Sequence, residues 1–313
     1  MSGLAKEIKD RALELGFSKV GIAPAERLEA DSARLSDWLA GGYHGSMGWM
    51  AQNFQRRVDP GAVLPGARSI VSVAMNYYTP DRHSDDPATG KVSRYAWGDD
   101  YHGVLEERLK QLLAFVRQRE PRAAGKVYVD TGPVMEKLWA QRAGIGWEGK
   151  HTNVITEEYG SWVFLGEMIL DIGLDYDEPS VDRCGTCTLC IEACPTQAII
   201  EPYLLDSNRC ISYLTIEHRG AIARELGEQF DRWVYGCDIC QDVCPWNSKF
   251  SKPTDLEAFA PREQNKAPRL SDLASLSEEE FTARYRKSAM KRTKRAGMIR
   301  NATVAMTSKP AGD

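Results

Sequence analysis

The eight cysteines are the residues whose spacing points most directly to chemistry. All of them fall between positions 184 and 244 of a chain of 313 residues. The first run is Cys184-x2-Cys187-x2-Cys190-x3-Cys194-Pro195, and the second, Cys237-x2-Cys240-x3-Cys244-Pro245, repeats its end. This is the spacing of bacterial two-cluster ferredoxins, in which the last cysteine of a run binds the other [4Fe–4S] cluster. Clustered cysteines in a chain of this kind bind metal more often than they form disulfides.

The repeated spacing predicts which cysteines bind which cluster. The second run lacks a leading cysteine, and Cys210 is the one that remains. Pseudo-symmetry then gives two sets of ligands, one of Cys184, Cys187, Cys190 and Cys244, the other of Cys194, Cys210, Cys237 and Cys240. A pair of structural zinc sites is the alternative, because CxxC pairs also bind Zn²⁺. The crossed partial repeat is not zinc-ribbon spacing, so we expect two [4Fe–4S] clusters and redox chemistry.

Asp130 stands at the end of a predicted strand, 126–130, and just before Pro133. Pro133 suits the first residue of a helix that runs to about Arg142. One interpretation is that Asp130 helps to cap this helix, and spacing alone favours it. The other is a carboxyl group that points from the strand end into a pocket and donates a proton there.

Two other patterns are weaker. The glycines of Gly144-x-Gly146-x-x-Gly149-Lys150 match a dinucleotide fingerprint and nearly match a P-loop. Both motifs need a strand before the glycines and a helix after them, whereas here the order is reversed. The five histidines, at 44, 83, 102, 151 and 218, are scattered, and each is interpreted as a surface or packing residue.

The elements that must position these groups alternate in type. Apolar periodicity predicts helices over 4–15 and 101–120, and strands over 19–23, 68–77, 126–130 and 162–170. An acidic link at 175–182 leads into the cysteine region. We therefore predict an α+β fold with three parts: residues 1–175, residues 176–250 with the clusters, and a helical segment at 251–313.

Composition places the chain among globular proteins, with 42% hydrophobic and 27% charged residues. No apolar run approaches the roughly 18 residues of a spanning helix, and the N-terminus does not look like a signal peptide, so a cytoplasmic protein is expected.

The net charge of −4 hides one basic segment without an acid, which contains Arg284, Arg286, Lys287, Lys291, Arg292, Lys294, Arg295 and Arg300. Its spacing predicts a helix that either is simply solvated or binds nucleic-acid phosphates, and the acidic remainder of the chain favours phosphate binding.

Taken together, these segments resemble the epoxyqueuosine reductases, cobalamin- and iron–sulfur-dependent enzymes of queuosine synthesis related to reductive dehalogenases. The segments that carry the resemblance are Leu64–Ser69, Ser93-Arg94-Tyr95, Asp100-Tyr101-His102, Asp130-Thr131-Gly132-Pro133, Gly144–Asn153, the eight cysteines, Ser212–His218 and Tyr235-Gly236-Cys237-Asp238. The resemblance implies a nitroreductase-like cobalamin-binding domain followed by a ferredoxin-like domain. It also implies reduction of epoxyqueuosine at the wobble position of tRNA, with electrons from an external flavodoxin- or ferredoxin-like donor, and we expect a monomer.

The resemblance also implies roles for single residues. Asp130 would be the proton donor. Cobalamin contacts would fall at Arg57, Ser93, Asp130, Thr152, Asn153, Val154, Ser212, Cys237 and Asp238. The tRNA would contact the basic segment through Lys287, Lys291, Arg292, Lys294, Arg295 and Arg300. A corrinoid-dependent reductase of a small molecule is the second hypothesis, and a ferredoxin-type electron-transfer protein is the third.

Overall fold

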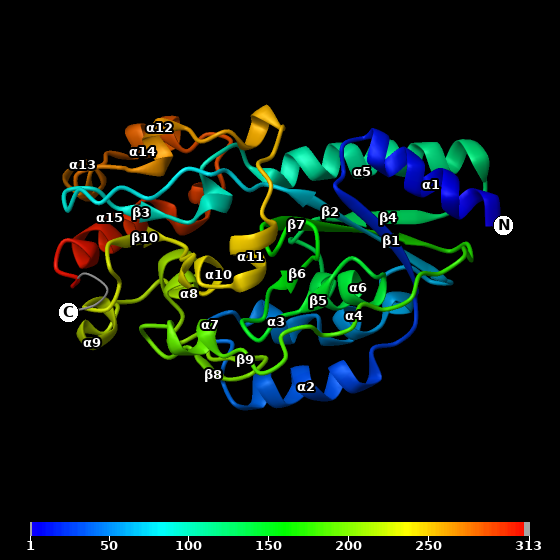
Figure 1. Ribbon diagram of the computed structural model, residues 1–313, viewed down its shortest axis with the longest axis horizontal. Coiled ribbons are helices and arrows are strands. Elements are labelled where there is room, and N and C mark those ends of the chain that lie inside the picture. The colour runs from blue at the N-terminus through cyan, green and yellow to red at the C-terminus, as the bar shows by residue number, and fades with distance from the viewer. Residues whose placement is uncertain (1, 310–313) are drawn as a thin grey trace.

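A four-stranded antiparallel sheet forms the centre of the computed structural model, which describes residues 2–309. Its order is β1 (Lys19–Pro24), β2 (Ser69–Asn76), β7 (Val163–Leu170) and β4 (Gly125–Tyr128). Every residue of β2 is buried, because helices cover both faces of the sheet. Figure 1 shows α1 (Ser2–Glu14) and α5 (Tyr101–Arg119) on one face, and α2 (Glu29–Ala40), α4 (Phe54–Val58) and α6 (Glu136–Arg142) on the other.

The predicted strands and helices of this part are found within a few residues, with one informative exception. β4 ends at Tyr128, and α6 begins at Glu136 instead of at Pro133. Between them Asp130 adopts the left-handed conformation, with φ of 56°, which a strand or helix residue does not adopt. The residues from 129 to 135 therefore form a loop that projects from the edge strand of the sheet.

The cysteine region follows the acidic link and consists of short elements. They are α7 (Leu189–Glu192), β8 (Ile199–Glu201), β9 (Leu204–Leu205), α8 (Ile211–Ile216), α9 (Arg224–Gly227), β10 (Trp233–Tyr235), α10 (Ile239–Asp242) and α11 (Pro245–Phe250). The helices α7 and α10 each carry the second-last cysteine of a run, and they pack against each other. The two cysteine runs of the sequence thus fold as two similar short helices that pack against each other. The predicted α+β fold class is confirmed.

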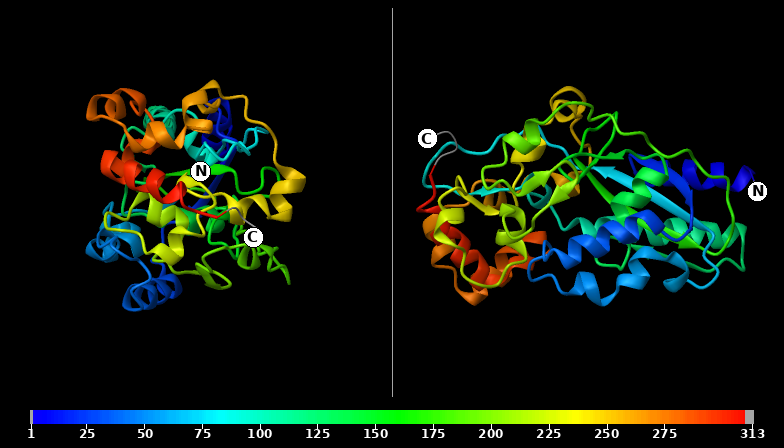
Figure 2. Two further views of the ribbon diagram at one scale, coloured as in Figure 1. Left: turned by 90° about the vertical axis from the view of Figure 1, so that its left-hand side faces the viewer. Right: turned by 90° about the horizontal axis from the view of Figure 1, so that it is seen from below.

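A third core joins distant parts of the chain. β3 (Lys91–Val92) pairs in parallel with β10, and Trp97, Val234, Leu270 and Met298 pack together around this pair. Figure 2 shows the C-terminal elements gathered at this end of the molecule: α12 (Glu263–Lys266), α13 (Leu270–Ala274), α14 (Glu278–Arg284) and α15 (Lys294–Ala305). Because all three predicted parts contribute to this core, the division at residues 175 and 250 stays a prediction.

The prediction of one basic helix is wrong. α14 ends at Arg284, a 3₁₀ turn, η4, occupies Ala289–Thr293, and α15 begins at Lys294. Lys287 and Lys294 have φ of 58° and 63°, so the chain turns at both lysines. The physical reason is burial: Tyr285 and Met290 are fully buried in the third core, which a continuous solvated helix would not allow.

Within residues 2–309, none of the helices has the length and apolar composition of a membrane span.

Candidate functional site

A cavity of about 380 Å³ lies between the sheet and the cysteine region. Six of the predicted cofactor contacts line it, namely Ser93, Thr152, Asn153, Val154, Ser212 and Cys237. They come from the end of β3, the loop before β6 (Val154–Ile155), the helix α8 and the end of β10. Asp238 lies beneath the wall, where it accepts hydrogen bonds from the Ser93 hydroxyl (2.5 Å) and the Arg94 amide (2.9 Å).

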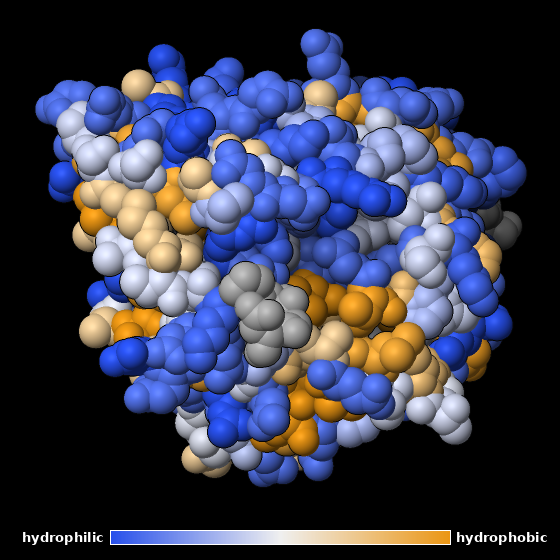
Figure 3. Space-filling view, turned by 60° about the vertical axis from the view of Figure 1, so that its left-hand side comes forward, coloured by the Kyte–Doolittle hydropathy of each residue, from blue (hydrophilic) through white to orange (hydrophobic). Residues whose placement is uncertain are grey.

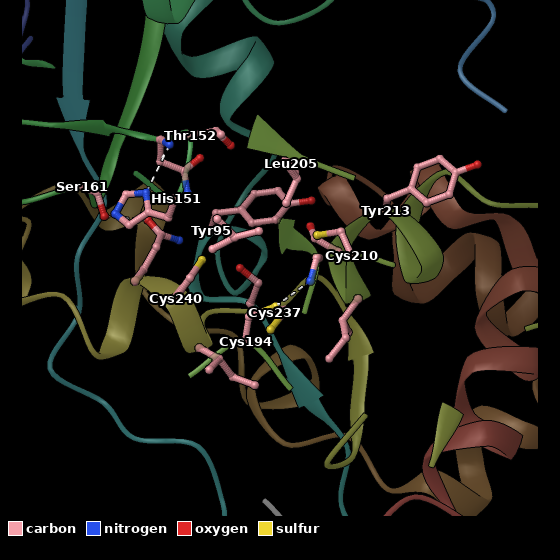
Figure 4. A pocket seen from close by; sticks show the side chains of 18 of the residues that line it. Tyr95, His151, Thr152, Ser161, Cys194, Leu205, Cys210, Tyr213, Cys237 and Cys240 are labelled. Carbon is pink, nitrogen blue, oxygen red and sulfur yellow. Dashed lines mark hydrogen bonds between the residues drawn. The ribbon is translucent and has the colours of Figure 1, made fainter. Parts of the chain in front are cut away.

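The eight cysteines divide into two groups in relation to this cavity. All four of one set line it, Cys194, Cys210, Cys237 and Cys240, whereas no member of the other set does. Figure 4 shows the four thiols gathered on one side of the cavity, below Tyr95. Cys190 belongs to the other group: burial raises its pKa to about 11, and the neighbouring thiols of Cys184, Cys244 and Cys187 add to this shift. We name these groups the cavity set and the distal set.

The opposite wall presents an unpaired hydrogen-bond donor. Burial lowers the pKa of His151 to about 4, so the ring is neutral, and its Nδ1 accepts a hydrogen bond from the Asn153 amide (3.2 Å). The proton is then on Nε2, which is buried and has no partner within residues 2–309. Next to it Thr152 has φ of 64°. Figure 4 shows His151 and Thr152 side by side at the cavity. Such a wall suits a large ligand with polar acceptors along its edge.

Asp130 and Arg57 lie outside the cavity lining, at its neighbouring edge. The Asp130 amide donates to the Glu136 carboxyl group, and Asp130 Oδ2 is 3.3 Å from Nε2 of His102. The Asp130 side chain is 60% exposed. Burial lowers the pKa of Arg57, while the charges of Glu136 and Asp130 act in the opposite direction, so the three groups are near one another.

The capping interpretation of Asp130 is wrong, because Met135 is the N-cap residue of α6 and no side chain caps that helix. The Asp130 carboxylate faces outward towards His102 instead. Tyr101, the residue before His102, lines the cavity and also lowers the pKa of Asp130, so Asp130 lies close to the cavity edge.

His102 is a site residue that the sequence reasoning missed. Its Nδ1 is 2.6 Å from Asp100 Oδ1, and the same oxygen accepts the His102 amide at the start of α5. Burial alone would lower the pKa of His102, but hydrogen bonds to Asp100 and Asp130 raise it to about 9. The sequence did contain one signal. In the segment Asp100-Tyr101-His102, an aspartate that can cap a helix stands two residues before a histidine, which is close enough for the two side chains to meet.

Two further carboxyl groups, one half-buried and one fully buried, lie near the Asp130 loop, and they too were missed. Burial raises the pKa of Glu136 to about 8, and the nearby Asp130 charge adds to the shift. Glu167, fully buried on β7, accepts from the Ser72 hydroxyl (3.3 Å), and burial raises its pKa well above the usual range. Both groups are therefore protonated and neutral near pH 7.

The basic segment contains two kinds of side chain. Three of the arginines are engaged: Arg292 forms a two-point ion pair with Glu217 (2.7 and 2.8 Å), Arg295 donates to the Leu276 carbonyl, and Arg300 donates to the carbonyls of Leu214, His218 and Gly220. The lysines at 287, 291 and 294 are exposed and make no side-chain hydrogen bond or ion pair within the described residues.

This segment lies beside the acid–histidine pair. The Lys287 carbonyl accepts the Asp100 amide (2.9 Å), and the charge of Arg292 reaches Asp130. Figure 3, which brings this end of the molecule forward, shows a mainly hydrophilic face with one group of hydrophobic side chains beside a hollow.

Comparisons with known proteins agree with this geometry. Residues 57–131 match the family described as Epoxyqueuosine reductase QueG, DUF1730, and residues 183–247 match the 4Fe-4S double cluster binding domain. The epoxyqueuosine reductase of Synechocystis sp. is 50% identical over 286 residues, which cover 90% of this chain and 98% of that protein. The Escherichia coli enzyme is 42% identical, and the match covers 99% of this chain and 82% of that protein. A solved structure of an epoxyqueuosine reductase with a tRNA-Tyr epoxyqueuosine-modified stem loop superposes with a TM-score of 0.90 at 34% identity, covering 97% of this chain and 80% of that chain.

Proposed function

This chain belongs to the epoxyqueuosine reductase family and is an oxidoreductase, and from that premise we propose that it reduces epoxyqueuosine to queuosine in the anticodon loop of tRNA. The observation that carries the proposal is the cavity between four thiols of a double-cluster domain and an exposed carboxylate. Removal of an epoxide oxygen as water needs two electrons and two protons. The thiols that line the cavity and the carboxylate at its edge would serve to deliver them.

The cavity set and the distal set would hold one [4Fe–4S] cluster each. Free thiols at all eight positions fit this use, because cluster ligands are thiolates. Since only the cavity set lines the cavity, the distal cluster would receive electrons from an external one-electron donor and pass them to the cavity cluster.

The cavity itself would hold cobalamin. Its polar rim fits the amide-bearing edge of a corrin ring, with the unpaired His151 Nε2–H and the Ser93 and Ser212 hydroxyls available as partners. When bound, this cofactor would supply a strongly reducing metal centre. The chain's own residues then position the tRNA base, exclude water through the tyrosines Tyr95 and Tyr101, and bring Asp130 to the epoxide oxygen.

The test is an anaerobic reaction of the protein, reconstituted with iron, sulfide and hydroxocobalamin, on a stem–loop RNA that carries epoxyqueuosine. We expect corrinoid absorption bands beside the broad iron–sulfur absorption, and a nucleoside product with one oxygen fewer than the substrate. A protein that binds no corrinoid would instead fit the ferredoxin hypothesis. A corrinoid protein that leaves the modified RNA unchanged and reduces halogenated small molecules would fit the dehalogenase-like hypothesis.

The structure refines the prediction for tRNA binding. Changing Lys287, Lys291 and Lys294 together to Gln should weaken binding of the stem loop and flatten its salt dependence, by about 0.7–0.9 in the log–log slope for each phosphate that the protein no longer neutralises. These lysines are exposed, so cluster content and thermal stability should not change. The matched control changes three exposed lysines on other helices, Lys6, Lys110 and Lys249, to Gln. Unaltered affinity and salt slope in the first variant would show that the RNA binds elsewhere.

A further inference from the structure

The proposed reaction consumes more protons than one carboxyl group supplies. Converting an epoxide to an alkene breaks two C–O bonds and releases water, which takes two electrons and two protons. Asp130 is the carboxyl group at the site, yet the hydrogen bond and the charge of His102 hold its pKa low, against the effect of burial. The Asp130 carboxylate is therefore ionised near pH 7, and the proton must come to it from another group.

We propose that His102 holds the proton that the reaction consumes and passes it through the Asp130 carboxylate to the substrate oxygen. This inference deepens the proposed function and rests on it. Asp130 remains the group that touches the substrate, and His102 acts through it.

The geometry fixes the imidazole for this transfer. Asp100 Oδ1 accepts a hydrogen bond from His102 Nδ1–H (2.6 Å). The other ring nitrogen, Nε2, therefore faces Asp130 Oδ2 (3.3 Å). Asp100 is itself anchored, since it caps α5 and its amide donates to the Lys287 carbonyl (2.9 Å). The ring also stacks on Tyr101, with 4.1 Å between the centroids. Because Nδ1 is bonded to Asp100, the proton that His102 can transfer is the one on Nε2, and its acceptor is the Asp130 carboxylate.

The surrounding charges favour the imidazolium. At the start of α5 it faces Asp100 and stacks on Tyr101, and on the loop after β4 it faces Asp130. Glu136 of α6 is also near, but it is protonated near pH 7 and adds no charge. Arg292 of η4 and Arg57 of α4 are cations near Asp130, and the charge of Arg292 is already paired with Glu217. With a pKa of about 9, His102 is protonated at neutral pH.

Two proton transfers by this route supply the two protons that the reaction needs. In each pass the proton moves from Nε2 to Asp130 Oδ2, and from the carboxyl group to the oxygen that leaves carbon; the second pass completes water. His102 is left neutral and takes a new proton from solvent, to which 30% of its side chain is exposed. Two passes match electrons that arrive one at a time from the clusters.

The first test is the pH dependence of single-turnover reduction by pre-reduced enzyme. The wild-type rate should be constant from pH 6 to 8 and should fall above about pH 9, where His102 loses its proton. His102→Gln should be slower by about 10²-fold at pH 8 and should recover as the pH falls, because Asp130 must then be protonated directly from water. Asp100→Asn should shift the alkaline decline to lower pH, because His102 loses one of the two carboxylates that raise its pKa.

The second test does not depend on turnover. A ¹³C-histidine NMR titration of the protein with oxidised clusters, with the His102 signal assigned by its absence in His102→Gln, should give a pKa near 9 that falls in Asp130→Asn and in Asp100→Asn. Wild-type rate and pH profile in His102→Gln would overturn the inference while leaving Asp130 and the proposed function intact. Loss of activity at every pH, with clusters and RNA binding retained, would also overturn it and reduce His102 to a structural role. Full activity in Asp130→Asn would instead contradict the proposed acid itself.

Discussion

Asp130→Asn should lose most turnover, by about 10²–10⁴-fold, while cluster content, cobalamin binding and tRNA affinity stay near those of the wild type. The substitution keeps the shape of the side chain but removes its ability to accept a proton from His102 and give it up again. Asn also tolerates the left-handed conformation that Asp130 has, with φ of 56°, so the loop is not expected to change. Single-turnover reduction of the modified stem loop measures the effect.

The matched control is Asp272→Asn, on the exposed side of α13. It removes one carboxylate charge, as Asp130→Asn does, but on another helix. The rate of single-turnover reduction should therefore stay unchanged. Near-normal turnover in Asp130→Asn, under saturating reductant, would show that the proton reaches the epoxide by another route. A Glu136→Gln variant then gives a further comparison, because it keeps a carbonyl oxygen for the Asp130 amide but removes the titratable group.

The two cysteine sets could be proposed from the sequence because the spacing that defines them is local, and they stay a prediction. Two runs of fixed spacing, each ending in Cys-Pro, fold as two similar turns, α7 and α10, and the structure places the remaining Cys210 with the cavity set. The strands β1, β2 and β7 could also be predicted from the sequence, since each is a run of mainly apolar residues with a buried centre. The [4Fe–4S] clusters follow from this spacing and agree with the double-cluster family match.

The acid site could not be predicted in the same way, because it depends on long-range contacts. His102 is one of five scattered histidines, and only the fold brings it to Asp130, 28 residues further along the chain. The prediction of one helix for the basic segment was wrong for a related reason. Its charges suggested one helix, but the buried side chains between them, Tyr285 and Met290, decide the path of the chain. That path engages Arg292, Arg295 and Arg300 and leaves the lysines exposed.

Cys210→Ala and Cys244→Ala should each remove one cluster, and with different consequences. Each variant should keep about half of the wild-type iron and acid-labile sulfide, because each cysteine belongs to one set of four. Cys210 lines the cavity, so its removal should abolish the last step of electron transfer and disturb cobalamin binding as well. Cys244 belongs to the distal set, which does not line the cavity, so Cys244→Ala should still bind cobalamin normally.

The choice of reductant separates the two variants. With a protein donor, both should be inactive, because the relay is broken in each. With a small, strong reductant that reaches the cavity directly, Cys244→Ala should recover substantial single-turnover reduction, whereas Cys210→Ala should not. Equal behaviour of the two variants with both reductants would contradict the order in which electrons pass from the distal to the cavity cluster. Stoichiometric zinc in place of iron would contradict the clusters themselves. If only the order fails, the electrons enter at the cavity cluster, and the cavity must then be open to the donor protein before the tRNA binds.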